Sequence, residues 1–175
     1  MVEIFSDAIG LDNLQETHWL SLAVRESRVR GLESLHTVRR RLDVLGGEIE
    51  TLDGLENLRR LGTLRVTAPH LTSIRALSSV EVIDGSLETL EAESLEDLRG
   101  LENVRRISGS MKVRLTSADQ IGVFDNLESV GGDVFLLVDE ELICEAGMAF
   151  SEKSIGGTLV VGPTDLGGFD PASCE

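Results

Sequence analysis

The sequence predicts a mainly β protein: a right-handed β-solenoid of about six to seven coils, with one parallel sheet and a C-terminal cap. Apolar residues recur in columns about 23 residues apart, which is a period typical of repeat proteins. Within a repeat they fall on every third residue, a spacing that forms neither a single helical stripe nor a strand alternation. Each repeat also ends in two apolar residues that flank one other residue, as in a half-buried strand.

Six repeats align when each begins at Gly-Leu-Glu-Asn-Leu or a related sequence, and a degenerate seventh copy follows. The starts are Gly10, Gly31, Gly54, Ala76, Gly100 and Val123. The first apolar column is Leu11, Leu32, Leu55, Leu77, Leu101 and Phe124. The second column is Leu14, Leu35, Leu58, Val80, Val104 and Leu127. The third column is Val38, Leu61, Ile83, Ile107, Val130 and Ile155, and all three columns should stack as a core.

One short strand is expected in each repeat, with the pattern x-Leu-x-Val. The expected pairs are Leu42/Val44, Leu64/Val66, Leu87/Thr89, Met111/Val113, Val134/Leu136 and Leu159/Val161. Because alternate strand residues point to opposite faces, these pairs should face the core and the residues between them should face outward. Four glycines precede the strands at corners, where a positive φ would favour glycine: Gly85, Gly109, Gly132 and Gly157.

The outward residues of these strands form the candidate interaction face. Its members are Asp43, Arg65, Glu88, Lys112, Phe135, Leu137 and Val160. The first four alternate in charge, as neighbours on a parallel sheet prefer. The last three are apolar, which indicates either a contact site or a surface covered by the tail, residues 162–175.

Two further polar columns accompany the repeat. One alternates in charge and reads His36, Arg59, Glu81, Arg105 and Glu128. The other reads Asn13, Ser34, Asn57, Ser79, Asn103 and Asn126, and these side chains could form a hydrogen-bonded ladder across the turns. Trp19, the lone Trp, is expected to cover the open first coil. We interpret these columns as structural rather than catalytic.

The 175 residues suit a single domain, with a cap and first coil over 1–24, repeat coils over 25–161 and a cap tail over 162–175. The net charge of −15 argues against nucleic acid as a partner, because phosphate binding requires a basic stripe. Residues 1–114 hold 15 of the 16 Lys and Arg, whereas residues 115–175 hold one Lys and 12 acids. That acidic half either maintains solubility or docks a basic partner or Ca²⁺. The acidic run Asp139, Glu140 and Glu141 is interpreted as a solvated turn or a weak Ca²⁺ site.

The assembled unit, Gly-Leu-x-x-Leu-x-x-Ile-x-Gly-x-Leu-x-Val, is most complete at residues 100–113. It resembles the receptor L domain of insulin-receptor and EGF-receptor type ectodomains, and also the leucine-rich coils of bacterial surface proteins. The resemblance covers about residues 10–161. It implies a rigid module that recognises a protein.

The C-terminal end is also similar to that family, in which an Asn-Pro-x-Leu-Cys-like turn precedes a final strand and a closing cysteine. Here acids replace the Asn-Pro before Cys144, and Cys174 follows the expected last strand. The resemblance implies a Cys144–Cys174 disulfide that pins the last coil, with two free thiols as the alternative. Such a bond would contribute about 3–4 kcal/mol and would require an oxidising compartment.

No constellation of catalytic residues is recognisable. His18, His36 and His70 lack a partner that would make a nucleophile or a base, and the Gly-Gly pairs lack the Lys-Ser/Thr of a phosphate loop. Two Cys and three His match no zinc spacing. We therefore expect no enzyme, no cofactor and no metal site.

The leading functional hypothesis is a non-catalytic protein-recognition module that uses the solenoid sheet face and is secreted, periplasmic or cell-surface exposed. The alternatives are a structural or cytoplasmic leucine-rich scaffold without a dedicated ligand and, third, a solenoid carbohydrate-active enzyme, for which the chain lacks Tyr platforms. The sequence contains no run of 18 apolar residues, so no transmembrane segment is predicted. The first residues lack signal-peptide features, so an extracellular location would require a leader upstream, which could carry a lipid anchor.

Overall fold

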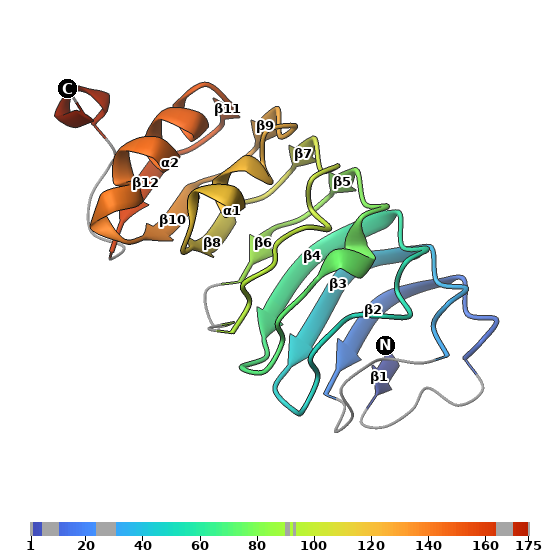
Figure 1. Ribbon diagram of the computed structural model, residues 1–175. Helices are drawn as coiled ribbons and strands as arrows, with labels where there is room; N and C mark the ends of the chain where they lie inside the picture. The colour runs from blue at the N-terminus through green and yellow to red at the C-terminus, as the bar shows by residue number, and fades with distance from the viewer. Residues whose placement is uncertain are drawn as a thin grey trace.

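The computed structural model describes residues 2–4, 11–23, 31–89, 92, 94–163 and 170–174. These residues form a mainly β structure with one large parallel sheet and a few short helices (Figure 1). The sheet has 12 strands, and every strand pairing in it is parallel. Figure 1 shows the strands stacked along an elongated molecule, from β1 at one end to β12 and helix α2 at the other.

The strands near the N-terminus are single and mostly long. They are β1 (Val2–Ile4), β2 (Glu16–Leu22), β3 (Thr37–Leu45) and β4 (Arg60–Thr67). Each later repeat contributes a pair of shorter strands instead. These pairs are β5 (Val82–Ile83) with β6 (Leu87–Glu88), β7 (Arg106–Ile107) with β8 (Met111–Leu115), β9 (Ser129–Val130) with β10 (Val134–Val138), and β11 (Ser154–Ile155) with β12 (Leu159–Gly162).

The pairing register agrees with the predicted strand pattern. The first inward residues are direct partners across six neighbouring strands, in the order Leu42, Leu64, Leu87, Met111, Val134 and Leu159. The partners two residues further on include Val44 with Val66 and Val113 with Leu136. Because side chains alternate between the two faces along each strand, one apolar face of this sheet points toward the interior, as expected.

The sheet divides at β4, which the sequence analysis did not predict. Beyond β4, the strands β6, β8, β10 and β12 form one branch, and β5, β7, β9 and β11 form a second branch built on the third apolar column. The later repeats have one more residue at this corner than β4, since Leu61 and Leu64 pair with Ile83 and Leu87. Strand β3 has the same longer spacing, from Val38 to Leu42, but it stays continuous and accommodates the extra residue as a register shift against β4.

The corner glycines serve close packing rather than a positive φ, which corrects the expectation. Positive φ values occur instead at Gly31, Gly46, Gly47, Gly54 and Gly100. A Cβ on Gly109 would lie 2.9 Å from the backbone carbon of Gly85 in the preceding repeat, and one on Gly131 would lie 2.3 Å from the carbonyl oxygen of Ser108. Stacked corners approach so closely that only a residue without a side chain fits.

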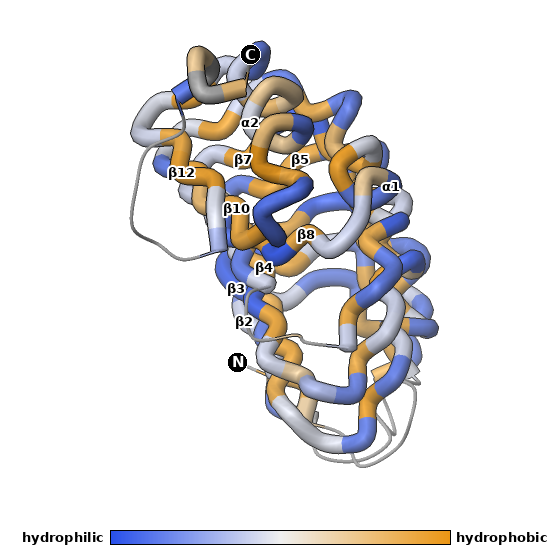
Figure 2. The backbone as a smooth tube through the Cα atoms, turned by 60° about the vertical axis from the view of Figure 1, so that its left-hand side comes forward, coloured by the Kyte–Doolittle hydropathy of each residue, from blue (hydrophilic) through white to orange (hydrophobic). Residues whose placement is uncertain are grey.

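The three apolar columns form the core. Their members are buried from Leu32 onward, except Ile155 in the last repeat, which is half-buried, like Leu11 and Leu14 in the first. Leu, Val and Ile supply most of the volume, and Phe124 contacts Phe150 with ring centroids 5.7 Å apart. Figure 2 shows hydrophobic segments of β8, β10 and β12 lying side by side, as stacked columns require.

The helices are short and lie mostly in the C-terminal half. They are η1 (Arg75–Leu77), α1 (Ala118–Gly122), η2 (Glu140–Leu142), α2 (Ile143–Ser151) and η3 (Pro171–Cys174). Helix α2 directly follows η2, and it buries Ala146 and Phe150. A disulfide joins Cys144 in α2 to Cys174 in η3, which is the pairing that the family resemblance implied. This bond fixes the described end of the tail against α2.

Side chains also bond neighbouring repeats at the corner between the two branches. The backbone N–H of Ser86 donates to Thr63 Oγ1 (3.2 Å), and that of Ser110 donates to Ser86 Oγ (3.1 Å). The series continues with Asp133 N–H to Ser110 Oγ (3.2 Å) and Thr158 N–H to Asp133 Oδ1 (2.8 Å). This corner ladder, Thr63–Ser86–Ser110–Asp133–Thr158, satisfies backbone donors that the interrupted strands leave unpaired.

The asparagine column forms a ladder of a related kind. The side-chain amides of Asn57, Asn103 and Asn126 donate to backbone carbonyl oxygens in the preceding repeat, at 2.6, 2.9 and 2.8 Å. The acceptors are backbone groups rather than the neighbouring polar side chains of the column. The ladder therefore holds the turns together through the main chain, which explains why Ser can replace Asn in alternate repeats without breaking a side-chain series.

Candidate interaction surface

The structure brings the predicted interaction face together as one row on the outer side of the sheet. Six of its members are direct strand partners, in the order Asp43, Arg65, Glu88, Lys112, Phe135 and Val160. Leu137 lies two residues after Phe135 in β10 and pairs with Arg114 and Gly162. The row is therefore a geometric unit, although its members differ in exposure.

The middle of the row carries the exposed charges. Arg65 Nε lies 3.9 Å from Glu88 Oε2, and about two fifths of each side chain is accessible to solvent. Lys112 Nζ lies 5.0 Å from the centroid of the Phe135 ring, within the range of a cation–π contact. Such exposed pairs contribute at most about 1 kcal/mol each, so these side chains can change partners when another molecule binds.

Asp43 is not available to a partner, which corrects the expectation of an exposed charge. Only 5% of Asp43 is accessible, because the indole of Trp19 lies over it and donates Nε1–H to Asp43 Oδ2 at 2.7 Å. The guanidinium of Arg41 lies 5.5 Å from the Trp19 ring centroid and 3.9 Å from Asp43 Oδ1. Trp19 therefore lies on the outer face of β2, rather than covering the open end of the first coil.

The apolar end of the row is partly covered. Val160 is 8% accessible, whereas Phe135 and Leu137 are half-buried. The sequence predicts the tail, residues 162–175, as one cover for these residues. The described part of the tail, η3, contacts α2, and residues 164–169 lie outside the described residues. A tail that covers Phe135 remains a prediction.

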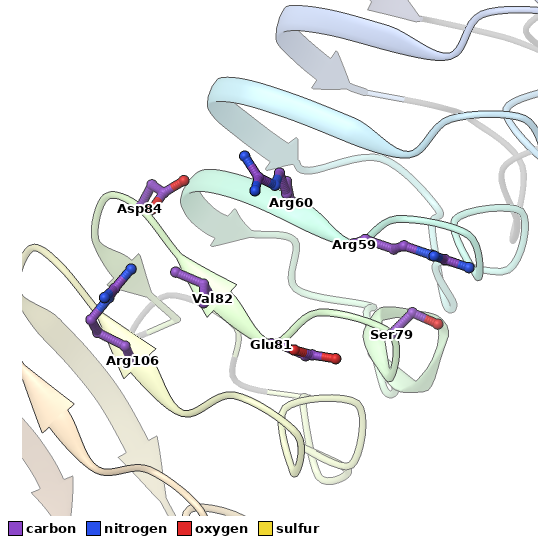
Figure 3. Close-up of a pocket in the computed structure, with 7 residues that line it drawn as sticks. All are labelled: Arg59, Arg60, Ser79, Glu81, Val82, Asp84 and Arg106. Carbon is purple, nitrogen blue, oxygen red and sulfur yellow. The ribbon is translucent and has the colours of Figure 1, made fainter.

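A second outer surface lies on the other branch, and the sequence analysis missed it. Arg60 of β4, Val82 of β5 and Arg106 of β7 are direct strand partners. They line a hollow of about 600 Å³ together with Arg59, Ser79, Glu81 and Asp84 (Figure 3). The repeat pattern places Arg59 and Arg105 in a polar column. Arg60 and Arg106 share a row only because of the second branch, which the repeat pattern does not predict.

Two smaller hollows adjoin the first. One, of about 260 Å³, shares Arg60 and Asp84 with it and also contacts Glu16 and Arg39. The other, of about 480 Å³, shares Asp84 and lies beside Trp19. Its remaining walls include Arg39, Arg40 and Arg41. We call these three hollows the arginine surface.

Glu16 and Arg39 lie at the edge of this surface and form an ion pair that is held by two hydrogen bonds. Arg39 Nε donates to Glu16 Oε1, and Nη2 donates to Glu16 Oε2 at 2.9 Å. The hydrogen bonds from Arg39 lower the pKa of Glu16, and the carboxylate raises the pKa of Arg39. Both groups therefore stay ionised, and each neutralises the other.

Asp97 provides another ion pair, away from both outer rows. Burial would raise the pKa of Asp97, but hydrogen bonds from Arg99 and Arg75 outweigh it and the pKa is lowered. Elsewhere, His18, His36 and His70 are exposed. Among the described residues, no three His, Cys, Asp or Glu side chains gather closely enough to hold a metal ion. Asp139, Glu140 and Glu141 lie on exposed backbone at and before η2.

Comparison with known protein families supplies the remaining observation. Residues 79–141 match the family model of the receptor L domain. The resemblance inferred from the repeat is thereby confirmed for this part of the chain, which runs from β5 into η2 and contains Glu88, Lys112, Phe135 and Leu137. Receptor L domains are non-enzymatic binding domains, so the match indicates a recognition module.

No curated protein and no solved structure matches the chain. None of the helices in the described ranges is long and apolar enough to cross a membrane. The receptor L domain match thus bears on the type of fold and on binding in general.

Proposed function

We propose that this chain is a non-catalytic protein-recognition module that binds a protein partner through the exposed part of the outer row. That part comprises Arg65, Glu88, Lys112, Phe135 and Leu137. The observation that supports it is the alignment of alternating charges with a half-buried aromatic, within the segment that matches a family of binding domains. Asp43 and Val160, which the sequence placed in the same face, are too buried to contribute.

The physical case rests on preorganisation. Strand pairing holds the backbones of Glu88, Lys112 and Phe135 at successive spacings of about 4.8 Å. Ordering these residues on binding would therefore cost this chain little conformational entropy. Phe135 offers apolar area at one end, and aromatic anchors dominate the energy of many protein interfaces. The charges beside it would set orientation and partner choice.

For the fold, we infer that the stacked repeats are the coils of a right-handed β-solenoid with about six to seven turns. Successive strand partners such as Leu64, Leu87, Met111 and Val134 lie 23 or 24 residues apart, which supports one turn per repeat. We retain the proposed division into a cap and first coil (1–24), repeat coils (25–161) and a cap tail (162–175).

We further propose that the protein works in an oxidising compartment, as a secreted, periplasmic or cell-surface protein. The Cys144–Cys174 disulfide supports this location, because structural disulfides persist in such compartments and are rare in the cytosol. A cytoplasmic scaffold would instead require the two thiols to be free in the isolated protein.

The test uses Phe135→Ala and Lys112→Glu in the disulfide-bonded protein, immobilised and exposed to an extract of envelope and secreted proteins. We expect both substitutions to reduce capture of a specific protein by more than tenfold, while the melting temperature stays within about 2 °C of that of the wild type. Glu96→Ala serves as a control, because Glu96 is exposed away from the row and its side chain makes none of the described contacts. Loss of stability with unchanged capture would instead identify Phe135 as a residue covered by the tail.

A further inference from the structure

We propose that the arginine surface is a binding site for an extended, acidic segment of a partner polypeptide. This surface lies over β2, β3, β4, β5 and β7, whereas the proposed interaction face follows β4, β6, β8 and β10. The inference therefore concerns a second site and does not depend on the first.

The charge of the arginine surface contrasts with that of the whole molecule. Six arginines line the three hollows, against the three carboxylates of Glu16, Glu81 and Asp84. The chain as a whole carries a net charge of −15. A local excess of three positive charges in such a chain would attract an acidic segment, and the remaining surface would repel it.

Most of these arginines have unused hydrogen-bond donors. Arg39 is paired with Glu16, and Arg41 lies against Trp19 and Asp43. Within the described residues, Arg40, Arg59, Arg60 and Arg106 form neither a side-chain hydrogen bond nor an ion pair. Each guanidinium presents a planar fork that matches the two oxygens of a carboxylate.

The arrangement of the row suits an extended chain. Arg60 and Arg106 lie two strands apart, about 10 Å between their Cα atoms, with Val82 between them as an apolar floor. Figure 3 shows Val82 between Arg60 and Arg106, with Asp84 at the same end of the strand. Carboxylates on alternate residues of an extended segment recur about every 7 Å, a separation that two flexible arginine side chains can span.

Asp84 favours a polypeptide over inorganic phosphate. Its carboxylate lines all three hollows and forms no ion pair within the described part of the chain. A polypeptide can donate backbone N–H groups to this carboxylate while its own acidic side chains contact the arginines. Inorganic phosphate near neutral pH is mainly an acceptor and would be repelled by Asp84.

The experiment titrates the disulfide-bonded protein with hexaglutamate whose termini are blocked, by isothermal titration calorimetry at low ionic strength. Trp19 is the single Trp of a chain without Tyr, so its fluorescence reports the hollow beside it. Arg60→Gln and Arg106→Gln should each weaken binding about two- to fivefold. Asp84→Asn should strengthen binding by a similar factor, because it keeps an acceptor oxygen and removes the repelling charge. A gain of affinity would not follow from a purely structural role.

Arg105→Gln is the matched control, since it removes the same charge one residue away from Arg106, outside the hollows. It should leave hexaglutamate binding unchanged. The proposal is overturned if hexaglutamate does not bind, including the case in which heparin or inorganic phosphate binds alone. It is equally overturned if Arg105→Gln weakens binding as much as Arg106→Gln, or if Asp84→Asn weakens it.

Discussion

The contact between Trp19 and Asp43 combines a short hydrogen bond with a buried carboxylate on the outer face. Asp43 Oδ2 accepts the indole N–H, and Asp43 Oδ1 is buried without a hydrogen-bond partner among the described residues. A buried carboxylate with few partners is costly, and loss of its one donor would add the desolvation penalty of that oxygen. The stability of β2 on β3 therefore depends on these two side chains as a pair.

Trp19→Phe should lower the free energy of unfolding by about 1–3 kcal/mol, because it removes the N–H donor and leaves the Asp43 carboxylate buried without a hydrogen bond. The effect should largely disappear in the Asp43→Ala background, where no carboxylate remains to be satisfied. A double-mutant cycle in urea, followed by far-UV circular dichroism because the substitution removes the fluorophore, measures this coupling. Additive effects of the two substitutions would contradict the proposed pairing.

At the residue scale, the sequence predicted position better than exposure. The period of two placed Asp43 in the outer row correctly, since Asp43 pairs with Arg65. Its burial depends on Trp19, 24 residues earlier, whose side chain crosses to the neighbouring strand. A repeat pattern determines the face of the sheet on which a side chain lies. It does not determine which large side chain of a neighbouring repeat covers that side chain.

At the scale of elements, the corners decide how tightly neighbouring repeats stack. The second branch of the sheet begins at β5, where glycine lies at the corner and lets the main chain of one repeat contact the next. The sequence located these glycines through their recurrence, yet it assigned them to positive φ. Contact distances between repeats are tertiary properties, so the recurrence alone could not distinguish the two reasons for glycine.

Gly131→Ala should destabilise the protein by about 1–3 kcal/mol, because the new Cβ would lie 2.3 Å from the Ser108 carbonyl oxygen, which belongs to the main chain and cannot rotate away. Gly122→Ala is the matched control. A Cβ there would have no neighbour closer than 3.9 Å, so the change should be neutral or slightly stabilising at the end of α1. Urea midpoints measure both, and similar midpoints for the two variants would contradict the packing explanation.

At the scale of the whole molecule, a helix and a disulfide close the C-terminal end. Helix α2 contributes Phe150 to the core against Phe124, and the disulfide holds η3 on α2. The repeat period predicted the apolar columns, and the family resemblance predicted the cysteine pairing. The sequence did not predict α1, which is a single short turn without a periodic apolar stripe, nor the arginine surface, which depends on the second branch of the sheet.

Cys144→Ser should lower the free energy of unfolding by about 2–4 kcal/mol under oxidising conditions, since the crosslink restricts the unfolded chain. Reductant should lower the melting temperature of the wild type to that of the variant and should leave the variant unchanged. Differential scanning calorimetry with and without reductant measures both effects. Two free thiols, found by alkylation and mass spectrometry of the freshly isolated protein, would contradict both the crosslink and the proposed compartment.

The corner ladder bears on how such a molecule can change in length. Ser86 and Ser110 each donate a backbone N–H to the preceding repeat and accept one from the following repeat through the side-chain hydroxyl. A unit that carries its own donor and its own acceptor is interchangeable with its neighbour. Duplication or deletion of one such unit would join the same groups again at the new junction, so the gene could lengthen or shorten the molecule by a whole repeat and keep this series of hydrogen bonds.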